Sequence, residues 1–193
     1  MNLINCNSAL KILKSGLPII FPTDTLPAIG CLPIFSKIIY EFKKRDKNKP
    51  LILMGSEHKQ LIEYVHESAR KDYENIASKY WPGALTMVIP SSEKQTAILT
   101  SKDLTLGLRI PNSQLAQSLL KETGPLLTSS ANISGLKGSI TAEGISLDFP
   151  SVDILGPVPW EKSSGKASTI ISWKKSGDWK LIRQGEVLVR EMY

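Results

Sequence analysis

The chain has 193 residues, of which 41% are hydrophobic and 22% are charged, and its formal net charge is +6. This composition argues against a disordered, fibrous or repeat protein, and the length suffices for one well-buried core. Cys6 and Cys31 are too few for a disulfide framework or a cysteine-rich zinc site, which fits a reducing cytoplasm. No signal peptide and no apolar run of membrane-spanning length is present, so we expect a soluble cytoplasmic protein with no membrane partner.

Predicted helices and strands alternate in the first half of the chain. We expect Asn7 or Ser8 to cap the first helix and Gly16 to end it. Apolar residues at helical spacing predict further helices at 34–44, 57–65, 69–80 and 114–121. Short apolar runs predict strands at 17–21, 51–54, 84–89, 105–110, 125–128, 152–155, 168–172 and 179–182.

This order of elements favours an α/β fold. Helices separate the early strands and strands dominate later, which predicts a twisted mixed β-sheet with flanking helices rather than a regular doubly wound one. The sequence contains no internal repeat and no linker rich in Pro, Gly and Ser, so we interpret residues 1–193 as a single domain. Segment 136–166 has the loosest pattern and is expected to be the most flexible.

The residues from Pro22 to Thr25 follow the first predicted strand, where open α/β folds often bind ligands. Thr23 and Asp24 also suit a local turn in which their side chains bind their own backbone. The pattern leaves both interpretations open.

A basic cluster occupies residues 37–49, which contain six basic and two acidic side chains, a net charge of +4. The guanidinium group of Arg45 can hold two phosphate oxygens at once, while Lys43 and Lys49 act as point charges beside it. Cations at the end of a helix also complement the helix dipole, which would by itself explain Lys43 and Lys44.

Two further polar features lie in or after predicted strands. Arg109 is expected on the strand face opposite Leu108 and Ile110, directed either into a cleft or into solvent. Residues 128–135 place hydroxyl groups and an amide in one turn, where backbone N–H groups can meet phosphate. The nearest run to a phosphate-loop motif has Trp160 in place of its first glycine, and His58 and His66 lack a third metal ligand, so neither site is predicted.

Seven motifs in order resemble the YrdC-like family of threonylcarbamoyl-AMP synthases in its short, single-domain form. The resemblance covers essentially the whole chain and implies a YrdC-like fold. The motifs are Pro-Thr-Asp-Thr (22–25), Lys-Lys-Arg with Pro-Leu (43–51), Trp-Pro-Gly-Ala-Leu-Thr (81–86), Leu-Arg-Ile-Pro (108–111), Ser-Ala-Asn-Ile-Ser-Gly (130–135), Ser-Thr-Ile (168–170) and Ile-Arg-Gln-Gly (182–185). Pro27, Ala28 and Met54 depart from the family pattern near the amino-acid pocket.

The resemblance implies two substrate subsites. Lys43 and Arg45 would be the catalytic residues. The residues implied to bind ATP are Lys43, Arg45, Lys49, Thr105, Ser130, Asn132, Gly138 and Arg183. The residues implied to bind threonine are Thr23, Arg109, Thr128 and Ser168.

The implied reaction explains why the chain offers no paired nucleophile and base. Threonine and bicarbonate or CO2 form a carbamate, whose oxygen displaces pyrophosphate from the α-phosphorus of ATP. The substrate supplies the nucleophile, so the protein has to position it and neutralise charge. Mg²⁺ is expected on the phosphates, held mainly by substrate oxygens rather than by protein ligands.

The product would serve the threonylcarbamoyladenosine modification of tRNA, with downstream threonylcarbamoyl-transferase proteins as candidate partners. The main alternative is a non-catalytic protein that binds tRNA or double-stranded RNA, because a basic cluster also suits a phosphate backbone. Carbamoyl transfer to a protein partner is a second alternative.

Overall fold

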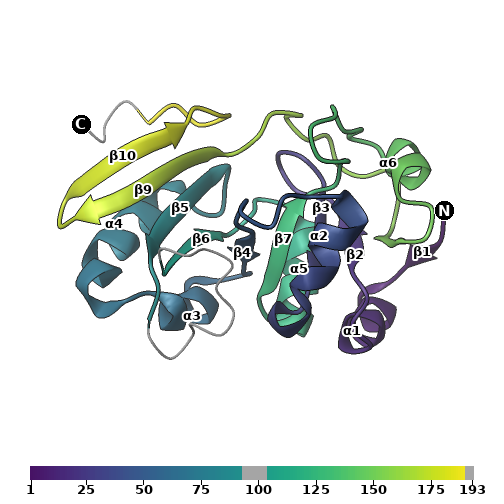
Figure 1. Cartoon of the computed structure of the whole chain (residues 1–193), viewed down its shortest axis with the longest axis horizontal. Coiled ribbons are helices and arrows are strands. Elements are labelled where there is room, and N and C mark those ends of the chain that lie inside the picture. The colour runs from purple at the N-terminus through teal and green to yellow at the C-terminus, as the bar shows by residue number, and fades with distance from the viewer. Residues whose placement is uncertain (93–103, 190–193) are drawn as a thin grey trace.

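A ten-stranded sheet runs the length of the molecule in the computed structural model, which describes residues 1–92 and 104–189 (Figure 1). The strand order is β1-β8-β2-β3-β7-β4-β6-β5-β9-β10. The strands are β1 (Leu3–Ile4), β2 (Ile19–Phe21), β3 (Ala28–Cys31), β4 (Ile52–Met54), β5 (Leu85–Pro90), β6 (Thr105–Arg109), β7 (Leu126–Ser130), β8 (Asp153–Leu155), β9 (Thr169–Lys175) and β10 (Asp178–Arg183).

The sheet is mixed. β8 pairs in parallel with β1 and β2, β4 with β6, and β5 with β9, whereas the other neighbours are antiparallel. The prediction of an α/β fold with a mixed sheet and flanking helices is therefore confirmed.

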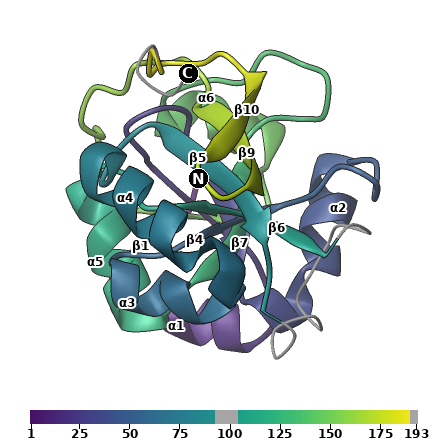
Figure 2. The ribbon, with the colours of Figure 1, turned by 90° about the vertical axis from the view of Figure 1, so that its left-hand side faces the viewer.

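Six α-helices lie in the described residues: α1 (Cys6–Lys14), α2 (Lys37–Lys43), α3 (His58–Leu61), α4 (Arg70–Tyr80), α5 (Gln114–Thr123) and α6 (Ala142–Asp148). Helix α4 packs along β5 near the β9–β10 end of the sheet, and α1 and α5 pack together beside β2 (Figures 1 and 2). None of these helices is long and apolar enough to cross a membrane.

Local sequence patterns predicted most elements, but strands β1 and β3 were not predicted and three features of the helices differ. The first helix is capped by Asn5, whose side chain accepts a hydrogen bond from the Ser8 amide, so the expected cap at Asn7 or Ser8 is wrong. The predicted helix at 34–44 is divided into a short 3₁₀ turn at Pro33–Phe35 and α2, because Pro33 starts the turn. Helix α6, capped by Thr141, lies inside segment 136–166, where no helix was predicted.

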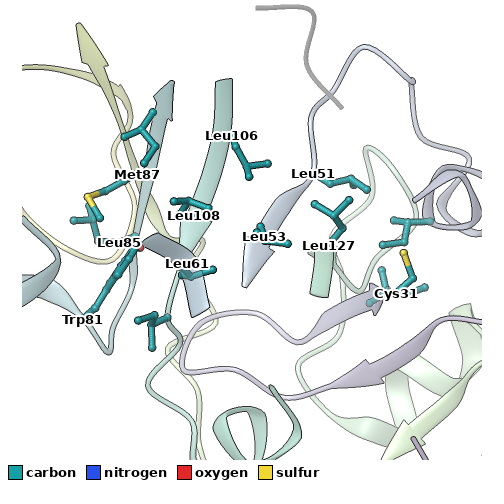
Figure 3. Packing of buried hydrophobic residues seen from close by; sticks show 14 of the residues in the cluster. Cys31, Leu51, Leu53, Leu61, Trp81, Leu85, Met87, Leu106, Leu108 and Leu127 are labelled. Carbon is teal, nitrogen blue, oxygen red and sulfur yellow. The ribbon is translucent and has the colours of Figure 1, made fainter. Parts of the chain in front are cut away.

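Alternate residues of the central strands form the larger hydrophobic core. Paired residues share a face of a sheet, and Leu53 pairs with both Leu108 and Leu127, while Met87 also pairs with Leu108. Each of these side chains is buried, and Figure 3 shows them gathered with Leu61 and Trp81. The residues between them in sequence must point to the opposite face of the sheet.

Candidate functional site

A cavity of about 370 Å³, here named the central cavity, lies on that opposite face. Ile52 pairs with Gly107 and Thr128, and Gly107 also pairs with Val88, so these residues share the face that lines the cavity. Gly107 has no side chain, so it leaves space for the cavity above the middle of the sheet. Strand alternation thus produces a dry core on one side and a hollow on the other.

The charged residues that line the central cavity are all basic. They are Arg45, Lys49, Arg109 and Arg183. The hydroxyl residues of the lining are Thr25, Thr86, Thr105, Thr128, Ser129, Ser130 and Ser168. Within residues 1–92 and 104–189 the ion pairs are Arg109–Asp24 and Lys166–Glu186, so Arg45, Lys49 and Arg183 have no carboxylate partner there. Such a lining favours a multiply charged anion with several oxygen acceptors.

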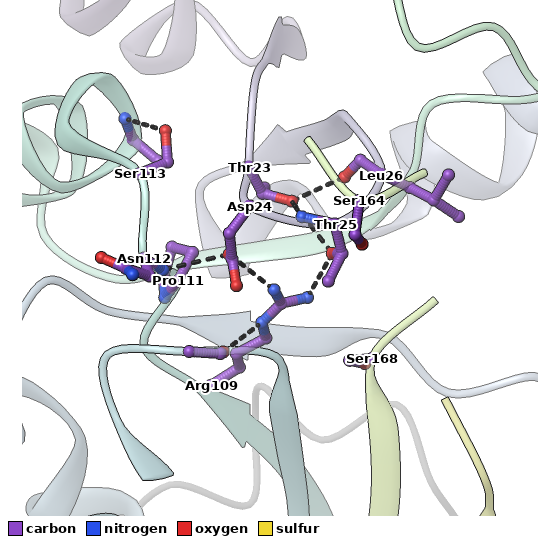
Figure 4. Close-up of polar contacts among 12 residues, drawn as sticks. Thr23, Asp24, Thr25, Leu26, Arg109, Pro111, Asn112, Ser113, Ser164 and Ser168 are labelled. Carbon is purple, nitrogen blue, oxygen red and sulfur yellow. Dashed lines mark hydrogen bonds and ion pairs between the residues drawn. The ribbon is translucent and has the colours of Figure 1, made fainter. Parts of the chain in front are cut away.

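Arg109 is buried at the edge of the cavity and is held from three directions (Figure 4). Its Nε donates to the Gly83 carbonyl at 3.0 Å, Nη1 to Thr25 Oγ1 at 2.8 Å, and Nη2 to Asp24 Oδ1 at 2.7 Å. Burial lowers the pKa of the guanidinium, and Asp24 opposes that shift. A guanidinium has five N–H donors, so two are not used by these three bonds.

Thr23 lies outside the central cavity. Its Oγ1 accepts from the Thr25 amide at 3.1 Å and donates to the Leu26 carbonyl at 2.8 Å, which is the local turn that the sequence left open (Figure 4). Thr23 and Asp24 instead line a second cavity of about 480 Å³, together with Trp160 and the first turn of α5. A direct contact between Thr23 and threonine stays a prediction.

Lys43 is buried at the end of α2, with 1% of its surface exposed, and does not line the central cavity. Its Nζ donates to the carbonyl of Ser130, to the carbonyl of Asn132 at 2.7 Å and to Asn132 Oδ1 at 3.3 Å. All three ammonium hydrogens are therefore directed at the 130–132 turn. Burial, together with the charge of Arg45, lowers the pKa of Lys43 to about 8.

Arg45 and Lys49 border the cavity from the loop after α2. Arg45 Nε donates to the Lys49 carbonyl at 3.3 Å and Nη2 to the Pro50 carbonyl at 3.1 Å. The loop begins at Lys44, whose left-handed backbone (φ 49°) ends the helix. These bonds brace the loop and use two of the five guanidinium donors of Arg45.

The turn after β7 is held by Asn132. Its Oδ1 accepts from Ser130 Oγ at 2.6 Å, and its Nδ2 donates to the Ile133 carbonyl at 2.9 Å and the Leu136 carbonyl at 2.8 Å. A Cβ on Gly138 would lie 2.6 Å from Asn132 Cβ, so only glycine fits there. Ser130 lines the central cavity, while Asn132 and Gly138 shape the turn behind it.

The other predicted contacts converge on the cavity from three strands. Thr105 from β6, Thr128 from β7 and Ser168 just before β9 all line it. Thr128 Oγ1 donates to the Ile52 carbonyl at 2.9 Å, which ties β7 to β4. Arg183, at the end of β10, reaches back to the Ser168 carbonyl. The structure thus brings eight of the twelve predicted residues to one cavity and sets Thr23, Lys43, Asn132 and Gly138 beside it.

Three hydroxyl residues of the lining were not among the predicted site residues. Thr25 and Ser129 directly adjoin Asp24 and Ser130, and Thr86 interrupts the apolar run of β5. A single hydroxyl inside a buried strand was the available signal for Thr86. No group of three or more His, Cys, Asp or Glu that could hold a metal ion occurs in the part of the chain that the structure describes.

Comparison with known proteins assigns the family. The model of the Sua5/YciO/YrdC family, described as telomere recombination, matches residues 11–185. The chain belongs to this family. It is 31% identical over 179 residues to the threonylcarbamoyl-AMP synthase of Buchnera aphidicola, covering 89% of this chain and 96% of that relative. It is 34% identical over 151 residues to the enzyme of that name from Yersinia enterocolitica, covering 75% and 79%.

Solved structures of the family have the same fold. Pyrococcus abyssi Sua5 in complex with L-threonine superposes with a TM-score of 0.85 at 28% identity, covering 96% of this chain and 58% of that chain. This chain therefore spans little more than half of that Sua5. Escherichia coli YciO superposes with a TM-score of 0.81 at 22% identity over 100% of this chain and 98% of its own, which supports the fold alone.

Proposed function

We propose that this protein is an L-threonylcarbamoyladenylate synthase, a nucleotidyltransferase that makes threonylcarbamoyl-AMP and pyrophosphate from L-threonine, bicarbonate or CO2, and ATP. The observation that carries the proposal is the central cavity, whose lining combines four basic side chains with seven hydroxyl groups and has no acidic residue. Two relatives that this chain covers over most of their length are named threonylcarbamoyl-AMP synthase. The solved structure of another relative is a complex with L-threonine. A purely RNA-binding role is not favoured by these relatives.

The cavity is suited to holding two anionic substrates side by side. Arg45, Lys49 and Arg183 would neutralise the triphosphate, with Thr105 and Ser130 as further ATP contacts. Arg109, Thr128 and Ser168 would hold the threonine carbamate. The carbamate oxygen then attacks the α-phosphorus and pyrophosphate leaves, so the protein supplies orientation and charge stabilisation rather than a nucleophile.

The proposal also includes a metal ion and an enzyme that uses the product. Mg²⁺ would be held by phosphate oxygens and water, in keeping with the all-basic lining of the cavity. The product would be consumed in the cytoplasm by a threonylcarbamoyl transferase that modifies tRNA.

Pyrophosphate release from ATP is expected to require threonine and bicarbonate together, because the attacking oxygen belongs to their carbamate. The measurement is pyrophosphate formation by the purified protein with Mg²⁺, omitting one substrate at a time, with mass-spectrometric detection of threonylcarbamoyl-AMP. Equal release without threonine would show a plain ATP pyrophosphohydrolase and contradict the proposal.

Arg45→Ala is expected to raise the apparent KM for ATP about ten- to a hundredfold, because a charge-assisted contact of about 1.5–3 kcal/mol is lost. Lys47→Ala is the matched control: Lys47 is exposed in the same loop, so its removal changes the net charge equally without altering the cavity. If both variants raise the KM for ATP equally, the loop acts only through its overall charge.

A further inference from the structure

Thr86 is a buried hydroxyl residue that lines the central cavity. It is not among the residues predicted to contact a substrate. It lies in β5 between Leu85 and Met87, with 0% of its surface exposed. A hydroxyl group buried in an apolar strand is costly unless it has a hydrogen-bond partner. The partner of Thr86 therefore indicates what this residue does.

That partner is the side chain of Ser168. Thr86 Oγ1 lies 2.9 Å from Ser168 Oγ, across the parallel pairing of β5 and β9. On its other side, β5 runs antiparallel to β6, where Met87 pairs with Leu108. The same register, extended by one residue beyond these pairs, puts Thr86 opposite Arg109. Thr86 thus lies between Arg109 and Ser168, two of the three side chains proposed to hold the threonine carbamate.

The backbone of Ser168 is fixed independently. Arg183 donates to the Ser168 carbonyl from Nε at 3.2 Å and from Nη2 at 2.8 Å. Gly185 packs so closely against Ala167 and Ser168 that a Cβ there would collide with their backbone atoms. With the backbone clamped, the remaining freedom of Ser168 is rotation of its side chain, and the bond to Thr86 restricts that rotation.

Which of the two hydroxyl groups donates in this hydrogen bond decides whether Ser168 can donate to a ligand. Between two hydroxyl groups either oxygen can be the donor. When Thr86 donates, Ser168 Oγ keeps its own hydrogen and can donate it into the cavity, which suits an anionic oxygen. Arg183 Nη2 also approaches Ser168 Oγ at 3.4 Å as a donor, which favours the same arrangement.

We infer that Thr86 is a positioning residue that orients the Ser168 hydroxyl as a hydrogen-bond donor to the amino-acid substrate. The inference rests on the proposed function and deepens it, since it assigns a determinant of threonine binding to a residue that is not among the predicted ATP contacts.

The test uses Thr86→Val, which keeps the shape of the side chain and removes its hydroxyl. This variant is expected to raise the apparent KM for L-threonine about tenfold, equivalent to about 1.4 kcal/mol, and to leave the KM for ATP within about twofold. Thr86→Ser restores the hydroxyl and should recover most of the affinity for threonine. Thr123→Val is the control, because Thr123 loses a hydroxyl bonded within α5, away from the cavity lining.

The outcomes separate this inference from the proposed function. A wild-type protein without threonine-dependent pyrophosphate release would overturn both. An active wild type whose Thr86→Val variant has an unchanged KM for threonine, or equal increases for both substrates, would overturn the positioning role alone. A crystal structure of Thr86→Val should show the Ser168 side chain in a new or mixed rotamer; an unchanged rotamer would also contradict the inference.

Discussion

Arg109→Lys is expected to raise the apparent KM for L-threonine at least about tenfold, or roughly 1.4 kcal/mol, with a much smaller change in the KM for ATP. Lysine keeps the positive charge opposite Asp24. Its single ammonium cannot reproduce the planar grip of a guanidinium that binds Gly83, Thr25 and Asp24 at once and still faces the cavity. Steady-state kinetics with one substrate varied at a time measures the split.

A second variant addresses folding. Arg109→Met leaves the Asp24 carboxylate without its buried partner, so the free energy of unfolding should fall by about 3–5 kcal/mol. Adding Asp24→Asn should recover part of that loss if the ion pair is the cause. Arg70→Lys, at the exposed start of α4, is the control: it loses only a long bond from Nε to the Val65 carbonyl at 3.4 Å and should change both quantities little. If Arg109→Lys shifts only the dependence on ATP, the assignment of the threonine subsite is wrong.

Lys43→Met is expected to lower kcat at least about a hundredfold, roughly 2.7 kcal/mol, without unfolding the protein. The ammonium of Lys43 holds the 130–132 turn through three acceptors, so its loss should misplace Ser130. Methionine fills a similar volume and removes the cost of burying a charge, so the free energy of unfolding should change little. Circular dichroism and denaturant unfolding provide the check; full activity in this variant would remove Lys43 from the site.

The same lysine predicts a pH dependence. With a pKa of about 8 in the folded protein, Lys43 loses its proton above pH 8, and the turn then loses a hydrogen-bond donor. Affinity for ATP, measured by calorimetry, should therefore fall above pH 8 in the wild type and show no such decline in Lys43→Met. Stability changes with the opposite sign: between pH 8 and 10.5 the unfolded chain binds more protons at this position, so its contribution to stability rises with pH.

Local sequence patterns were sufficient for most of the secondary structure and for the face on which Arg109 lies. Alternation along β6 places Arg109 opposite Leu108, because successive side chains of a strand point to opposite faces. The strand β3 was missed because Ala28–Cys31 is short and contains a glycine, and its place in the sheet depends on pairing with β2 and β7. Helix α6 was missed because prolines, glycines and serines surround it.

By itself, the sequence determined the fold class, the family motifs and the residue types of the site, since these depend on local periodicity and on residues close together in the chain. Only the tertiary structure decided which side chains face the cavity and which support it. The local pattern around Lys43 was also compatible with a cation that only complements a helix dipole, yet its partners in the 130–132 turn lie 87 and 89 positions away. Arg109 meets Asp24 across 85 positions, and Thr86 meets Ser168 across 82. Such contacts follow from strand order and register, which no local pattern encodes.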